Sequence, residues 1–84
     1  MLVMAVMNDM ALSMNGFKVA ARYYRKDGSH MTFWTGNGQI FVKETRRRRT
    51  PFVKFFNSTL EANNYFKERQ DICRKYGDEW RKEQ

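Results

Sequence analysis

The chain has 84 residues, a net charge of +7 from 16 Lys or Arg against 9 Asp or Glu, and one cysteine. A chain of this length predicts a single domain over residues 1–84, with little material left to wall off a deep, water-excluding catalytic cavity. Without a second cysteine, a positively charged leader or an apolar run of about 18 residues, we expect neither secretion nor a membrane partner and predict a cytoplasmic protein.

The positive charge is concentrated in the middle of the chain. Residues 17–56 carry ten Lys or Arg against only Asp27 and Glu44, which gives this segment a charge of +8. Residues 57–84 carry six charges of each sign, and residues 1–16 carry only Asp9. Localised positive charge attracts anionic partners, namely nucleic acid, an acidic protein surface or a lipid headgroup.

Residues 1–16 form an apolar segment in which methionine recurs every third position from Met1 to Met10. The pattern predicts a short helix or an irregular apolar arm, because methionine adapts to irregular surfaces. We consider three interpretations. The arm folds over its own sheet, it forms a partner or homodimer surface, or Met14 is the true first residue.

A change to a two-residue period from Phe17 onwards predicts a basic β-sheet over residues 17–56. Strands are expected over residues 17–24, 30–35 and 39–44, joined by turns at Asp27-Gly28 and Gly36-Asn37-Gly38, which makes a meander. Arg46, Arg47, Arg48 and Arg49 follow in an exposed loop that ends at the only proline. Residues 52–56 have a strand-like composition and predict either a fourth strand or the return of a long hairpin.

Residues 57–84 predict a C-terminal helix. Ser58 and Glu61 have the spacing of a capping box, and Gly77 is suited to end the helix after Tyr76. One stripe of the helix holds Ala62, Phe66, Cys73, Tyr76 and Trp80, with a short continuation through Trp80 left open. The expected fold is therefore α+β, an antiparallel sheet of three or four strands with one helix packed on one face.

This order of three strands and a helix resembles that of small DNA-binding modules such as the AP2 domain and the arm-binding domain of tyrosine recombinases. The junction from Phe56 to Ala62 is similar to the strand-to-helix junction of AP2 domains. The likeness covers a small part of the chain, and the Arg and Trp pattern of AP2 strands is not reproduced. It implies an analogy of fold, which does not by itself imply function.

Catalytic and metal-binding patterns are sparse. His30 and Cys73 are the only histidine and cysteine, too few for a structural zinc site. Cys73 lies on the expected buried stripe of the helix, and His30 lies beside a turn. We therefore predict a protein that is not an enzyme and has no cofactor or metal.

The two faces of the predicted sheet differ in character, because successive side chains of a strand alternate. The face toward the helix is expected to hold Phe17, Val19, Ala21, Tyr23, Met31, Phe33, Ile40, Val42, Val53 and Phe55. The opposite face would then carry four cations and three aromatic residues, namely Lys18, Arg22, Lys43 and Lys54 with Tyr24, Trp34 and Phe41.

Cations beside aromatic rings are typical of nucleic-acid binding, because cations contact phosphates and rings stack on bases. Our first hypothesis is a small basic protein that binds DNA or RNA through this face and the arginine loop. In a rival interpretation the aromatic residues are covered by residues 1–14 and form a second core. The alternative function is a phage or mobile-element accessory protein that inhibits a host protein or nucleoprotein complex by direct binding.

Overall fold

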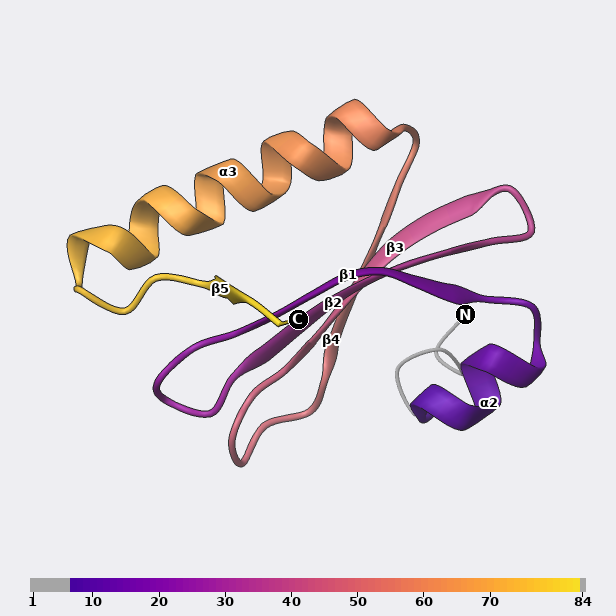
Figure 1. The fold of residues 1–84 in the computed structure, drawn as a ribbon, viewed down its shortest axis with the longest axis horizontal. Helices are drawn as coiled ribbons and strands as arrows, with labels where there is room; N and C mark the ends of the chain where they lie inside the picture. Colours follow the sequence, from indigo (N-terminus) through magenta and orange to yellow (C-terminus); the bar gives the residue numbers. More distant parts are fainter. Residues whose placement is uncertain (1–6, 84) are drawn as a thin grey trace.

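The computed structural model describes residues 7–83 and shows an antiparallel sheet with one long helix on one face (Figure 1). Along the chain the elements are α2 (Asp9–Met14), β1 (Lys18–Tyr24), β2 (His30–Gly36), β3 (Gln39–Thr45), β4 (Phe52–Phe56), α3 (Thr59–Lys75) and β5 (Arg81–Lys82). The order in the sheet is β4-β3-β2-β1-β5. The predicted α+β meander is confirmed. Within the described residues, no helix has both the length and the apolar character needed to cross a bilayer.

The local signals for turns and caps act as expected. Asn37 and Gly38 have φ angles of 52° and 73°, the left-handed pair that a tight hairpin turn requires. The Ser58 hydroxyl accepts a hydrogen bond from the Glu61 amide at 3.1 Å, so one orphan donor of the first turn of α3 is satisfied. Gly77 follows the helix with φ 70°. Residues 52–56 form a fourth strand that pairs with β3.

The chain after α3 differs from the expected helical stripe. Tyr76 is exposed, and the chain turns back at Gly77 instead of continuing as a helix. The Gln70 amide then holds the Trp80 backbone in both directions, donating from Nε2 to the carbonyl at 2.9 Å and accepting from the amide at 2.7 Å. These two bonds place Trp80 in the core and bring β5 alongside β1, a fifth strand that the sequence analysis missed.

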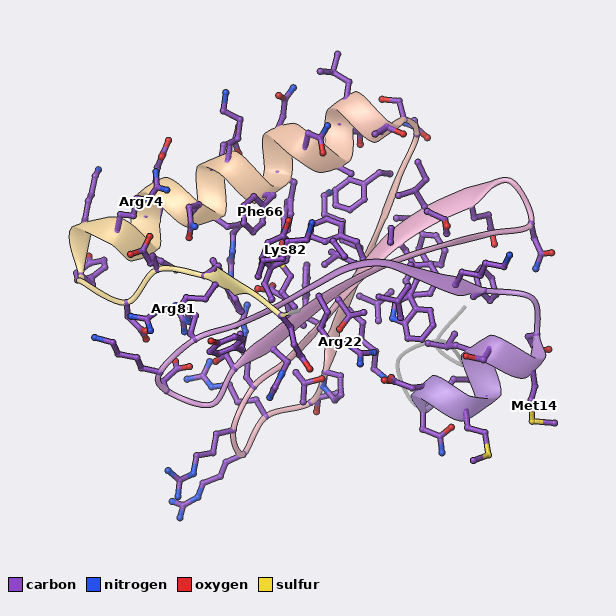
Figure 2. The ribbon with its side chains drawn as sticks, in the orientation of Figure 1. Met14, Arg22, Phe66, Arg74, Arg81 and Lys82 are labelled. Carbon is purple, nitrogen blue, oxygen red and sulfur yellow. The ribbon has the colours of Figure 1, made fainter. Side chains whose placement is uncertain are left out.

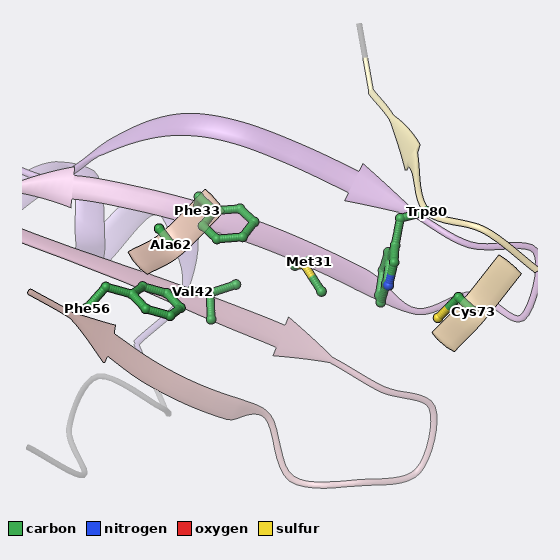
Figure 3. Packing of buried hydrophobic residues seen from close by; sticks show 7 residues of the cluster. All are labelled: Met31, Phe33, Val42, Phe56, Ala62, Cys73 and Trp80. Carbon is green, nitrogen blue, oxygen red and sulfur yellow. The ribbon is translucent and has the colours of Figure 1, made fainter. Parts of the chain in front are cut away.

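Two apolar cores lie on opposite faces of the sheet. The larger lies between the sheet and α3 and holds Met31, Phe33, Val42, Phe56, Ala62, Cys73 and Trp80 (Figure 3). The smaller lies on the other face, called here the outer face, and holds Leu12, Phe17, Trp34 and Phe41, with Met7 and Val53 at its edge. Residues 7–17 thus cover part of the outer face, as the covering interpretation predicts for Trp34 and Phe41; residues 1–6 of the predicted arm lie outside the described residues.

The predicted faces are wrong in the first half of β1, because this strand contains a bulge. Val19 pairs with Trp34 and Ala21 pairs with Phe33, so Ala20 is the extra residue. A bulge reverses the alternation on one side of it. Phe17 and Val19 therefore face outward, and Lys18, paired with Thr35, lies on the α3 side.

The phase of β4 is also opposite to the prediction. Phe52 pairs with Glu44 and Lys54 pairs with Val42, and directly opposed residues share a face. Lys54 is therefore on the α3 side, whereas Val53 and Phe55 face outward. The register of β4 is determined by how the loop of residues 46–51 closes, which strand composition alone does not specify.

Gly36 is a site where a single methyl group should be costly. A Cβ atom there would lie 2.5 Å from the Gly16 carbonyl oxygen and 2.9 Å from the Phe17 Cα, both on the backbone. We expect Gly36→Ala to lower the free energy of unfolding by about 1–3 kcal/mol in urea denaturation. The exposed loop variant Thr50→Ala should change it by less than about 0.5 kcal/mol. A Gly36→Ala protein as stable as the wild type would contradict this close packing.

Candidate nucleic-acid interface

The aromatic residues assigned to the outer face do not form an open platform. Trp34 is 1% exposed and Phe41 is 0% exposed, both in the smaller core beneath Leu12 and Phe17. Stacking on these two rings is therefore excluded by their burial. Tyr24, at 38% exposure, is the one member of the predicted aromatic set that stays partly accessible.

The cations assigned to the same face are also not gathered there. Arg22, which lies on the outer side with α2 (Figure 2), donates to Asp9 at 2.6 Å. The Lys43 ammonium group donates to the Met7 carbonyl. Lys18 and Lys54 lie on the α3 side, as shown above. The expected cationic sheet face is therefore not formed.

Arginines do converge at one end of the sheet. The β1–β2 turn and the β3–β4 loop lie at this end because the strands alternate in direction (Figure 1). Together with α3 they border an open groove of about 570 Å³, called here the arginine groove, which is lined by Arg25, Asp27, Ser29, Arg46, Arg47, Arg49 and Arg69. Five guanidinium groups thus line one concavity with a single carboxylate among them.

A buried carboxylate holds two of these arginines in place. Glu44 is fully buried and accepts hydrogen bonds from Arg69 at 2.7 Å and Arg46 at 3.3 Å. The Tyr65 hydroxyl donates to the same carboxylate at 3.1 Å. Burial and, after it, the negative charge of Glu44 raise the pKa of Tyr65 to about 12, so the phenol remains a donor well above the pH at which a free tyrosine ionises. Arg46 and Arg69 share one negative charge and leave one positive charge in excess.

Arg25 is held by residues of its own turn and of the C-terminal part of the chain, and not by Glu44. It donates to Asp27 and to the Cys73 sulfur at 2.9 Å, and it lies 3.9 Å from an Asp78 carboxylate oxygen. Burial opposes its charge, but these contacts with Cys73 and Asp27 raise the pKa of Arg25 above its ordinary value. Its guanidinium group therefore stays charged at the groove wall.

Arg47, Arg48 and Arg49 are exposed at the tip of the loop. Arg48 has φ 60° and takes the left-handed position in the turn, and it does not line the groove. The five lining arginines, opposed by Asp27, Asp78 and Glu44, leave an excess of about two positive charges by formal count. A planar guanidinium fork can bind two phosphate oxygens at once, so this groove suits a phosphate-bearing ligand.

Cys73 and His30, the two residues considered for catalysis or metal binding, lie on opposite faces of the sheet. Cys73 is buried in the larger core, and His30 lines a separate shallow hollow on the outer face with Asp9, Arg22 and Glu83. Among residues 7–83, no three His, Cys, Asp or Glu side chains are grouped so that they could hold a metal ion. The remaining cations are dispersed, with Arg74 on α3 and Arg81 and Lys82 on β5 (Figure 2).

Sequence reasoning identified the loop of residues 46–49 but missed Arg25, Arg69 and Glu44. One signal was available for Arg25, because alternate turns of a meander lie at the same end of the sheet. No comparable signal marked Arg69, whose part in the groove depends on how α3 crosses the sheet. Neither protein-family models, nor curated proteins, nor solved structures match this chain, so the groove is interpreted from its own geometry.

Proposed function

We propose that this chain is a non-enzymatic protein that binds the phosphate backbone of nucleic acid through the arginine groove. The observation that carries the proposal is the convergence of five arginines from three separate segments on one open concavity. Charges that meet in a concavity produce a stronger local potential than the same charges spread over a surface.

A phosphate backbone fits this groove better than scattered acidic side chains do. Each nucleotide brings one negative charge at a spacing of a few ångströms, so two or three successive phosphates can occupy the groove. The exposed guanidinium groups of Arg47 and Arg49 are free to turn toward them, while Glu44 and Asp27 orient their neighbours. Binding of this kind releases counterions and weakens steeply as salt increases.

Removal of the two exposed arginines that line the groove tests the proposal. We expect Arg47→Ala/Arg49→Ala to reduce affinity for labelled oligonucleotides by at least about tenfold at about 50 mM salt, measured by fluorescence anisotropy. The slope of log K against log salt should become shallower by about one to two, because about two phosphate contacts are lost.

The matched control is Lys67→Ala/Lys75→Ala, which removes the same charge from exposed positions of α3. An equal loss of affinity in this control would show that net charge alone is responsible and would contradict the groove. No measurable binding of the wild type to any DNA or RNA at about 50 mM salt would overturn the proposal and favour an acidic protein or nucleoprotein partner.

A further inference from the structure

An exposed aromatic ring is paired across the sheet with the carboxylate that holds two arginines of the groove. Phe52 is the first residue of β4, directly after the arginine loop, and is 42% exposed. It pairs across the sheet with Glu44, and residues opposed in this way have Cβ atoms about 4.5–5.5 Å apart on the same face. Glu44 also accepts hydrogen bonds from Arg46 and Arg69, so Phe52 and these two groove arginines share Glu44 as a neighbour.

This combination of a ring and cations suits an unpaired base with its phosphate. Bases stack on aromatic side chains whatever their identity, while cations hold the backbone beside them. In a duplex the base faces are already stacked on one another and are not accessible to a side chain. We infer that the ligand of the arginine groove is single-stranded nucleic acid and that Phe52 stacks on one of its bases, an inference that rests on the proposed function.

The shape of the molecule also disfavours a duplex. Residues 7–17 cover part of the outer face, and α3 covers the opposite face, so neither side of the sheet is a free flat surface. Five arginines converge at one end of the sheet, whereas Arg22 and Lys43 on the outer face are engaged by Asp9 and the Met7 carbonyl and do not extend the groove as a track. A flexible single strand can gather its phosphates in such a short site and turn one base toward Phe52.

The test compares Phe52→Ala with Phe55→Ala, a matched control on the same strand. Phe55 has nearly the same exposure, 39%, but faces outward and packs on Phe41 with ring centroids 5.1 Å apart. Each protein is titrated with single-stranded DNA and single-stranded RNA of about 12 nucleotides, and with the DNA duplex of the same sequence, by fluorescence anisotropy. The tighter of the two single strands identifies whether the natural source is DNA or RNA.

We expect the wild type to prefer a single strand over the duplex by at least about tenfold. Phe52→Ala should lose about five- to hundredfold in affinity for the single strand and little for the duplex, whereas Phe52→Tyr and Phe55→Ala should bind like the wild type. Equal binding of duplex and single strand by the wild type, or an unchanged single-strand affinity in Phe52→Ala, would overturn the inference.

A second measurement does not depend on a stable variant. Photocrosslinking of the wild type to an iodouracil-substituted single strand, read by mass spectrometry, should label the peptide that contains Phe52. Crosslinks only to other peptides would overturn the stacking role. If Arg47→Ala/Arg49→Ala abolishes binding while Phe52→Ala does not affect it, this inference fails and the proposed function stands. If no nucleic acid binds, the proposed function itself fails.

Discussion

Replacement of Trp34 by alanine is expected to lower the free energy of unfolding by about 3–5 kcal/mol, the cost of deleting a large buried aromatic side chain. Trp34 is almost completely buried on the outer face, against Leu12, Phe17 and Phe41. Total stabilities of domains are about 5–15 kcal/mol, so this one change should remove a large fraction. Urea denaturation followed by far-UV circular dichroism measures the loss.

Tyr24→Ala is the matched control, because Tyr24 is an aromatic residue on the same face of the sheet that remains partly exposed. We expect it to cost no more than about 1.5 kcal/mol. Should Trp34→Ala instead keep the stability of the wild type and lose affinity for an oligonucleotide, Trp34 would belong to a binding surface. The assignment of the outer face to a second core would then be wrong.

Substitution of Glu44 by glutamine is expected to lower the free energy of unfolding by about 3 kcal/mol. The change keeps the shape of the side chain but removes the one negative charge between Arg46 and Arg69. Breaking a buried pair costs about 3–5 kcal/mol, and the lower end applies because both arginine side chains are about one-third exposed and can regain water.

Asp71→Asn supplies the comparison for this change, since it removes the same charge from an exposed position of α3. Its expected effect on the free energy of unfolding is less than about 0.5 kcal/mol. Both values come from the same urea denaturation series. Equal and small losses in the two variants would show that Glu44 does not organise the groove.

Single-sequence reasoning succeeded wherever the determining interactions are local. The turn at Asn37-Gly38 depends on which residues tolerate a positive φ. The start of α3 depends on the Ser58 hydroxyl, which accepts a hydrogen bond from the amide of Glu61, three residues later. The turn and the helix start can each be recognised from a few adjacent residues. Strand composition and alternation likewise predicted the first three strands of the meander, because these are properties of the strand itself, and left residues 52–56 open between a fourth strand and the return of a long hairpin.

The sequence prediction was wrong about the face of the sheet on which several side chains of β1 and β4 lie. One extra residue at Ala20 reverses the first half of β1, and the closure of the arginine loop sets the phase of β4. A shift of one residue moves every side chain to the other face. Six residues were assigned to the wrong face for this reason, namely Phe17, Lys18, Val19, Val53, Lys54 and Phe55.

By itself, then, the sequence determined the first three strands, the main C-terminal helix, their order and the concentration of positive charge in residues 17–56, because these follow from neighbours along the chain. Only the tertiary structure decided that residues 7–17 bury Trp34 and Phe41, and that Arg25 and Arg69 join the loop arginines around Glu44. These groupings join residues tens of positions apart, and they depend on strand register and on how α3 crosses the sheet, which no local pattern encodes.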